Sequence, residues 1–419
     1  MIRYFFLKKS TYGNSSYLCG MKQTEEFRKF VKEHAGDDLT RLLLSASRYP
    51  SIDVPFAADQ IAARRQIREK LPSWYANDAL LFPSKISAEQ CSSEQTALYK
   101  QRLVAESDTL CDLTGGLGID SYYFSRKARQ ITYIERFPAY CDAARNNFSA
   151  LGVDNITVVE GDSSELASRL PRVDAFYIDP ARRGEGNKRV YALQDCEPDL
   201  PALLPELFRH APKVIAKLSP MADIRQTLEL LPGTTEVHVL SVKNECKELL
   251  FVMERVAERV TAVMSPVIHC INYDSSGREE AFAFTLQDER SEILQLADRI
   301  GRFFYEPNAS LLKAGAFKSV AVRFGLAKLH VSSHLYTSDT VVEDFPGRCF
   351  VVEEVYPFSG KLCKSLSKDI PQANMTVRNF PLSVEELRKR TKITDGGNVY
   401  LFATTLADSS KILVKCSKL

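Results

Sequence analysis

Four acidic residues of this chain end or follow short apolar segments. In chain order they are Asp112 after TLC, Glu135 after ITYI, Asp162 after ITVVEG and Asp179 after AFYI. The carboxyl ends of parallel strands meet at one edge of an open sheet, so we expect these side chains to converge there. Carboxylates accept hydrogen bonds from ribose hydroxyls and amino groups, and the series therefore favours a nucleotide site.

A glycine-rich turn follows the first of these acids. It contains Thr114, Gly115, Gly116 and Gly118, and a helical pattern begins directly after it. Without Cβ atoms the backbone can turn tightly and approach a ligand, while the first N–H groups of a helix attract anionic groups. The dinucleotide fingerprint G-x-G-x-x-G is incomplete, because Ser121 stands at its third glycine. The turn alone fits a nucleotide cofactor or an ordinary tight loop.

Alternating strand and helix patterns must position these residues. The segments TLCDL, ITYIE, ITVVEG, AFYIDP and KVIAKLSP start roughly 20 to 40 residues apart, with helical stretches between them. This spacing predicts parallel strands joined by helical crossovers. The next two segments, EVHVLSV and ELLFVME, are only a few residues apart, which is too short for a parallel crossover. We therefore predict an α/β fold with a Rossmann-like, mostly parallel sheet and an antiparallel last strand.

The spacing of apolar residues changes on either side of this pattern. Apolar residues recur at helical spacing before it, and mixed strands and helices with turn signals follow it. The predicted parts are a small helical domain of residues 21–84, the α/β domain of 85–258, and α+β domains of 259–345 and 346–419. Residues 1–20 are interpreted either as a disordered extension or as sequence before a start at Met21.

Composition excludes several classes of protein. The chain has 419 residues, of which 45% are hydrophobic, enough for more than one globular domain. Its formal net charge is only +2, but residues 361–419 carry 11 Lys and Arg against 5 Asp and Glu, so basic charge is concentrated there. The ten cysteines form no C-x-x-C motif and no group at metal-ligand spacing. We expect reduced thiols, no metal, no membrane span and a cytoplasmic location.

Between Ser87 and Arg255 the ordered acids and the glycine turn resemble the class I S-adenosylmethionine methyltransferases. The resemblance implies S-adenosylmethionine as the cofactor, with Asp112 among the residues that hold it. It places the methionine part against the glycine turn, the ribose against Glu135 and the adenine against Asp162. Thr114 stands where these enzymes carry their first glycine, so the contacts to the methionine part are left open.

Further motifs narrow the resemblance to one bacterial branch of these enzymes. They are EQCSSEQTALYK from Glu89, DPARR from Asp179, KLSP from Lys217, NECKELL from Asn244, YEPNASLLKAGAFK from Tyr305, HLYTS from His334, DFPGR from Asp344 and VRNFPLSVEELRK from Val377. Members of this branch carry a ferredoxin-like segment and a C-terminal THUMP-like domain. The resemblance therefore implies a ferredoxin-like domain over 259–345 and a THUMP-like domain over 346–419.

The residues after the fourth strand bear on the methylated atom. Asp179 and Pro180 are expected beside the reacting centre, together with Arg182. Enzymes that methylate exocyclic amines commonly carry an aromatic residue where Arg182 stands. Uracil C5 methyltransferases, which the DPAR string resembles, need a cysteine where this chain has Leu218-Ser219-Pro220. Both reactions are therefore disfavoured.

Basic and polar side chains are expected around the same pocket. The predicted substrate-binding residues are Gln90, Ser93, Arg183, Lys188, Arg189, Asn244, Glu245 and Lys247. The cations suit the phosphates of a folded RNA, either tRNA or rRNA, although a solvated charge run, a hairpin turn and helix capping account for the same residues. The sequence thus predicts an RNA methyltransferase that transfers its methyl group in line. The alternatives are a small-molecule or protein methyltransferase, and a non-catalytic RNA-binding protein with a vestigial cofactor fold.

Overall fold

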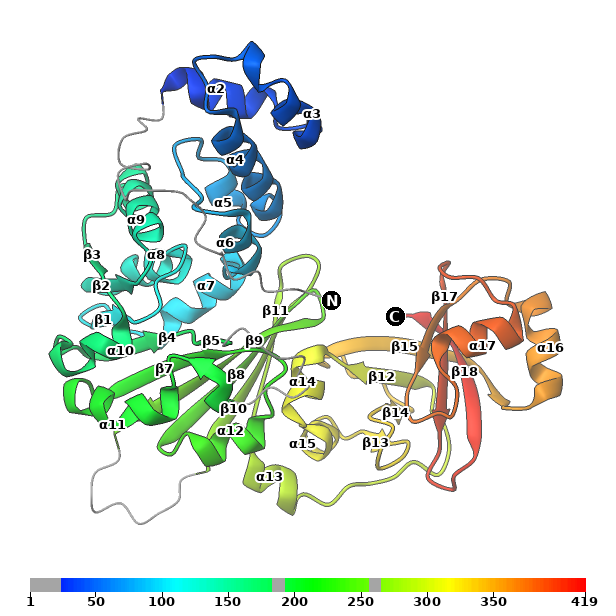
Figure 1. Ribbon diagram of the computed structural model, residues 1–419. Helices are drawn as coiled ribbons and strands as arrows, with labels where there is room; N and C mark the ends of the chain where they lie inside the picture. Colours follow the sequence, from blue (N-terminus) through cyan, green and yellow to red (C-terminus); the bar gives the residue numbers. More distant parts are fainter. Residues whose placement is uncertain (1–23, 183–192, 256–264) are drawn as a thin grey trace. The chain divides into compact units, whose positions relative to one another are not determined.

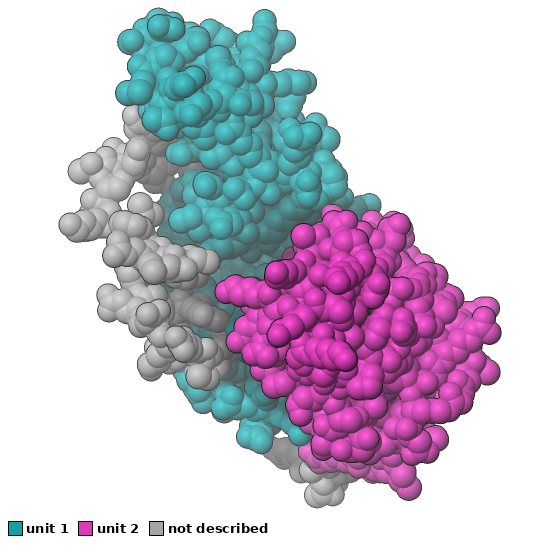
Figure 2. Space-filling model, turned by 90° about the vertical axis from the view of Figure 1, so that its right-hand side faces the viewer, with its two compact units in different colours: residues 1–234, 250–261 teal, residues 235–249, 262–419 magenta. Residues whose placement is uncertain are grey.

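The computed structural model describes residues 24–182, 193–255 and 265–419 (Figure 1). The chain divides into two compact units, residues 1–234 with 250–261 and residues 235–249 with 262–419 (Figure 2). No helix within the described ranges is long and apolar enough to cross a membrane.

The N-terminal part of the first unit consists of short helices. They are α2 (Glu25–Glu33), α3 (Leu39–Leu44), α4 (Val54–Ile67), α5 (Pro72–Tyr75), α6 (Lys85–Gln90) and α7 (Glu94–Lys100), with 3-10 turns at Ala46–Arg48 and Gln101–Leu103. Asp53 caps α4 by accepting the N–H of Phe56, at 3.0 Å. The buried faces of α2, α3 and α4 pack together around Phe27, Leu42 and Ile61. These helices therefore share an apolar core of their own.

A nine-stranded sheet follows, in the order β11-β10-β8-β9-β7-β4-β1-β2-β3. Its strands are β1 (Thr109–Asp112), β2 (Gln130–Glu135), β3 (Ile156–Glu160), β4 (Ala175–Ile178), β7 (Lys213–Leu218), β8 (Thr234–Val242), β9 (Glu245–Glu254), β10 (Val267–Tyr273) and β11 (Glu279–Thr285). β1 pairs in parallel with β2 and β4, β2 with β3, and β4 with β7. This parallel core confirms the predicted Rossmann-like fold class.

Helices connect these parallel strands, as the spacing of the apolar segments predicts. They are α8 (Ile119–Ser125), α9 (Pro138–Ala150), α10 (Ser163–Leu166) with a 3-10 turn at Ala167–Arg169, α11 (Leu200–His210) and α12 (Ile224–Leu230). Between β4 and α11, the described residues also form the short pair β5 (Ala181–Arg182) and β6 (Cys196–Glu197), with a 3-10 turn at Leu193–Asp195.

A two-residue turn joins β8 to β9. Its residues Lys243 and Asn244 both have positive φ, 51° and 61°, which is the conformation of a type I′ hairpin turn. Such a turn reverses the chain direction, so β9 is the antiparallel strand that the sequence predicts, but it is not the last strand, because β10 and β11 continue the sheet. β10 then pairs in parallel with β8, and β11 pairs antiparallel with β10.

The second sheet has the order β13-β14-β12-β15-β18-β17-β16. Its strands are β12 (Phe303–Pro307), β13 (Ala327–Lys328), β14 (Tyr336–Ser338), β15 (Gly347–Pro357), β16 (Asn374–Val377), β17 (Val399–Thr405) and β18 (Lys411–Lys418). The helices of this part of the chain are α13 (Leu286–Ser291), α14 (Ala309–Ala314), α15 (Phe317–Arg323), α16 (Gly360–Asp369) and α17 (Val384–Thr391). Phe304, Phe350 and Phe402 form the centre of its core. The sheet is mostly antiparallel, with one parallel pair between β16 and β17.

Candidate active site

A cavity of about 240 Å³ opens at the carboxyl ends of β1, β2, β4 and β7, within the first unit. Nine residues predicted from the sequence line it: Gln90, Asp112, Thr114, Gly115, Gly116, Gly118, Glu135, Asp162 and Asp179. The structure therefore brings the four strand-end acids and the glycine turn to one place.

The glycine turn is packed against β2. The Gly115 N–H donates to the Ile134 carbonyl at 2.8 Å, and the Tyr133 hydroxyl donates to the Gly116 carbonyl at 2.5 Å. A Cβ on Gly115 would lie 2.2 Å from the Tyr133 ring. Gly118 precedes α8 with a φ of 83°, which an L side chain rarely adopts. Glycine at these two positions is therefore required by close approach and by backbone conformation.

Two backbone N–H groups hold the Glu135 carboxylate in place. The Gly116 N–H donates to Oε2 and the Phe137 N–H donates to Oε1, both at 2.9 Å. Glu135 is 9% exposed and lines the cavity. Each oxygen keeps a second lone pair, so the carboxylate can still accept hydrogen bonds from a ligand.

Asp112 supports the glycine turn from beneath. Its Oδ1 accepts the Thr114 N–H at 3.1 Å, and its Oδ2 accepts the Ser121 hydroxyl at 2.6 Å. Burial raises the pKa of Asp112 to about 7, against the opposing effect of these hydrogen bonds. Ser121 thus has a structural use at the position where a dinucleotide fingerprint carries glycine.

Asp162 caps a short helix at the cavity wall. Its Oδ1 accepts the Ser164 N–H at 2.8 Å, which is the helix-capping role that its position in the sequence also allows. Its Oδ2 lies 3.6 Å from Arg136, and Arg136 lies 3.2 Å from Glu197. Arg136 and Glu197 also line the cavity, although sequence reasoning did not select them.

Asp179 connects the end of β4 to two other segments. Its N–H donates to the Thr114 hydroxyl at 2.7 Å, and its Oδ2 lies 2.5 Å from the Lys217 ammonium. Pro180, which follows it, is buried. Arg182 lies in β5, opposite Cys196 of β6.

Asp120 and Lys217 also line the cavity, and Lys100, which does not line it, pairs with Asp120. Sequence reasoning missed all three. Lys100 lies 2.8 Å from Asp120, while Lys217 lies 4.0 Å from Asp120. The hydroxyls of Ser92 and Tyr177 donate to Asp120 at 2.8 and 2.6 Å. Burial by itself would raise the pKa of Asp120, but the two lysines and the hydrogen bonds from Lys100 and Tyr177 lower it to about 2.

Of these three charges, only Lys217 left a signal in the sequence. Lys217 interrupts the apolar segment KVIAKLSP at a position flanked by Ala216 and Leu218, both buried. A lysine at a buried strand end is uncommon unless a carboxylate pairs with it. Lys100 and Asp120 lie in helices and give no such signal, because charged residues are ordinary on helix surfaces.

The predicted substrate-binding residues are placed differently. Gln90 lines the cavity, while Ser93 caps α7 and accepts the Thr96 N–H at 3.2 Å. In the second unit the Asn244 side chain accepts the Ala309 N–H at 2.7 Å, and Lys247 lies 2.6 Å from Glu245. The remaining three, Arg183, Lys188 and Arg189, lie outside the described residues.

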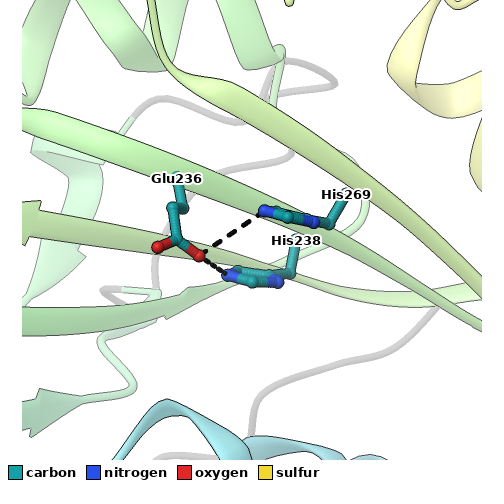
Figure 3. Close-up of side chains that lie close together, drawn as sticks. All are labelled: Glu236, His238 and His269. Atoms are coloured by element: carbon teal, nitrogen blue, oxygen red, sulfur yellow. Dashed lines mark ion pairs between the residues drawn. The ribbon is translucent and has the colours of Figure 1, made fainter. Parts of the chain in front are cut away.

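A separate group of histidines and a glutamate lies in the second unit (Figure 3). Nε2 of His238 and of His269 lie 3.1 and 3.5 Å from Oε2 of Glu236. The two rings are stacked, with 4.6 Å between centroids and 9° between planes. An imidazole binds a metal through a lone pair in its ring plane, and two parallel stacked rings cannot both meet one ion in this way. The group is therefore a stacked histidine pair beside a carboxylate.

Comparison with solved structures extends over almost the whole chain. A candidate methyltransferase from Porphyromonas gingivalis W83 has a crystal structure that is 41% identical in sequence and has a TM-score of 0.84. The match covers 94% of this chain and 97% of that chain. Family models of a ferredoxin-like domain and of a THUMP-like domain match residues 303–346 and 347–418.

Two curated relatives match smaller parts. An uncharacterized RNA methyltransferase of Enterococcus faecalis is 25% identical over 177 residues, 40% of this chain. An uncharacterized protein of Methanocaldococcus jannaschii is 32% identical over 102 residues, 24% of this chain. These matches span only 39% and 35% of the lengths of the two relatives.

The evidence for the family is thus the mostly parallel sheet with its antiparallel strand β9, the two matched C-terminal domains, and the full-length likeness to the Porphyromonas protein. The chain belongs to the bacterial branch of class I methyltransferases that carries ferredoxin-like and THUMP-like domains.

Proposed function

We propose that this protein transfers the methyl group of S-adenosylmethionine to a structured RNA, either tRNA or rRNA. The observation that carries the cofactor assignment is the Glu135 carboxylate, which backbone N–H groups fix above the glycine turn. A carboxylate ordered in this way can accept the hydroxyl groups of a ribose without first losing side-chain freedom. Membership of the family supports methyl transfer as the reaction. The bound cofactor would supply the electrophilic methyl group.

The other cavity residues suit the remaining parts of an adenosyl group. Asp162 would accept a hydrogen bond from the adenine amino group, and the turn at Gly116 and Gly118 would face the methionine part. Phe137 lines the cavity and is 51% exposed, which is unusual for an aromatic side chain. Its ring would cover one face of the adenine, and Arg136 already lies 5.0 Å from the ring centroid. This chain's own residues would thus orient the cofactor and exclude water from it.

A second cavity in the first unit supports the choice of RNA. It encloses about 390 Å³ beside α2 and α4, and its charged lining residues are Arg28, Lys32, Arg64, Arg65, Arg68 and Asp78. Arg64 and Arg65 brace the wall by donating to the carbonyls of Asn77 at 3.0 Å and Asp37 at 2.5 Å.

Two further cations that line this cavity, Arg28 and Arg68, are more open to a ligand. Among the described residues, neither Arg28 nor Arg68 lies within ion-pair distance of a carboxylate, and Arg68 is exposed. Clustered cations around a hollow suit phosphate groups. The Enterococcus relative, named as an RNA methyltransferase, supports the same substrate class.

Calorimetry with S-adenosylhomocysteine tests the cofactor assignment. Glu135→Gln should weaken binding at least about tenfold, because a charged acceptor for hydroxyl groups contributes on the order of 1.5–3 kcal/mol. Glu160→Gln is the matched control, since Glu160 is the register partner of Glu135 on β3 and is exposed. Equal affinity of the Glu135 variant and the control would contradict the assignment.

Filter binding of tRNA and rRNA at increasing salt tests the substrate class. Affinity for the preferred RNA should fall steeply with salt, because cationic side chains displace counterions from phosphates. The double variant Arg28→Gln with Arg68→Gln should bind less tightly and show a shallower salt slope. Lys29→Gln is the control, because Lys29 lies on the same helix beside Glu33, at 3.8 Å, and does not line this cavity. An affinity for RNA that changes neither with salt nor in these variants would favour a small-molecule or protein substrate.

A further inference from the structure

Four charged side chains in and beside the active-site cavity form two pairs. The inner pair is Lys100 with Asp120, whose atoms lie 2.8 Å apart and whose side chains are 1% and 11% exposed. The outer pair is Lys217 with Asp179, whose atoms lie 2.5 Å apart and whose side chains are 12% and 38% exposed. Asp120 and Asp179 both line the cavity, but Asp179 is the more open of the two, while Lys100 is enclosed.

The inner pair already balances its own charge. Asp120 accepts hydrogen bonds from Ser92 and Tyr177 besides its contact with Lys100. Lys217 lies farther from Asp120, at 4.0 Å, and its close carboxylate is Asp179. Lys217 also lowers the pKa of Asp120, but less than Lys100 does, and its nearest carboxylate is that of Asp179.

The outer pair is also expected to contribute little to the stability of the fold. A carboxylate that is 38% exposed can be hydrated without a partner, and a lysine side chain that is only 12% exposed costs more to bury than an apolar side chain. Ion pairs of this kind in a cavity are characteristic of sites that perform chemistry. The arrangement suits a methyl acceptor that needs an ammonium and a carboxylate side by side.

A hydroxyl group has this requirement. As its oxygen lone pair forms the new bond to the methyl carbon, the carbon–sulfur bond breaks and its electron pair returns to sulfur. The hydroxyl proton must leave at the same time, and Asp179 can accept it. Lys217 stabilises the negative charge that develops on the oxygen.

We propose that the methyl acceptor is a hydroxyl oxygen, with Asp179 as the proton acceptor and Lys217 as the group that stabilises the developing oxyanion. This inference rests on the proposed function, because RNA then offers one class of hydroxyl along its whole length, the ribose 2′-hydroxyl. The product is a 2′-O-methylated nucleotide within an intact RNA chain.

Alkaline hydrolysis of the product separates this inference from the proposed function. Unmethylated total RNA is incubated with the protein and with S-adenosylmethionine labelled in the methyl group, and is then hydrolysed in alkali. Alkaline cleavage needs a free 2′-hydroxyl, so the label should be recovered in dinucleotides. Label recovered in mononucleotides would overturn the inference while supporting an RNA methyltransferase that modifies a base. No label in any RNA would overturn the proposed function and the inference together.

Variants of the outer pair test the assigned roles. Lys217→Met and Asp179→Asn should each lower kcat at least about 100-fold, the usual contribution of a positioned proton acceptor or charge, with KM for RNA and affinity for S-adenosylhomocysteine within about threefold. The matched control is Lys213→Met on the same strand, because Lys213 donates to the Leu103 carbonyl and does not line the cavity.

The two variants guard against a trivial loss of activity. Thermal unfolding and S-adenosylhomocysteine binding show whether each variant is folded, and Asp179→Asn serves if Lys217→Met is not, since the Asp179 side chain is partly exposed. A folded variant of either residue that keeps a kcat close to that of the wild type would overturn the assigned roles. A fall in cofactor affinity that matches the fall in kcat would likewise do so, because it indicates a purely structural pair.

Discussion

The two units of the molecule each contain a cluster of charged side chains. The clusters differ in how exposed their carboxylates are. In the first unit two lysines meet two aspartates, and both aspartates line a cavity, with Asp179 the more exposed of the two. In the second unit one glutamate, Glu306, is 2% exposed and accepts hydrogen bonds from Arg348 and Arg378. We infer that a buried carboxylate held by two arginines serves the fold, whereas the more open Asp179 in a cavity is available for chemistry.

The strongest expected effect is on the inner pair. Asp120→Asn would leave Lys100, which is 1% exposed, without its carboxylate. Removing one partner of a buried ion pair costs on the order of 3–5 kcal/mol, so urea denaturation should show a loss of this size. A loss below about 1 kcal/mol would mean that Lys100 finds another anion, and the contrast between the inner and outer pairs would not hold.

The pH dependence of stability should reveal the raised pKa of Asp112. Its pKa is raised from about 4 in the unfolded chain to about 7 when folded, so its contribution is fully present below pH 4 and is lost as pH rises through 7. Three pKa units correspond to about 4 kcal/mol. Asp112→Asn should therefore gain up to that amount relative to the wild type between pH 4 and pH 8, as measured by urea denaturation at each pH. A constant difference would show that Asp112 keeps an ordinary pKa.

A smaller effect is expected in the second unit. Glu306→Gln removes the carboxylate, but Arg348 and Arg378 are 38% and 40% exposed and can be hydrated instead. We expect a loss of about 2 kcal/mol in the free energy of unfolding, less than for Asp120→Asn. Affinity for S-adenosylhomocysteine should not change in the folded variant, and a change would show that the cluster does more than hold its own unit together.

The smallest effect on stability belongs to the outer pair. Asp179→Asn should change the free energy of unfolding by less than about 1 kcal/mol, because a partly exposed carboxylate is screened by water. The same variant is expected to lose most of its methyl transfer. Stability and activity should be measured on the same sample of each variant. Asp179→Asn should lose activity and keep its stability, whereas Glu306→Gln should lose stability and keep its activity.

The sequence predicts the cofactor side of the site well, for a local reason. Strand ends and a glycine turn leave a readable pattern, and Asp112, Glu135, Asp162 and Asp179 all line one cavity. Their roles toward the cofactor stay predictions until binding is measured. Ser121 shows the limit of such patterns, because its hydroxyl holds Asp112 where a motif search expects only a missing glycine.

Lys100, Asp120 and Lys217 could not be brought together from the sequence. They come from α7, α8 and β7, and the sequence does not show which face of each helix turns inward. The basic cavity beside α2 and α4 was missed for the same reason, since its cations belong to two helices and read as solvated faces.

What the sequence by itself determined is therefore the order of strands and helices and the carboxylates at the strand ends, because periodicity and chain connectivity are local properties. Only the tertiary structure decided which charges meet in and beside the cavity and which of them stays open to a ligand. Those outcomes depend on packing between segments far apart in the chain, where a shift of a few ångströms separates an ion pair from two solvated charges.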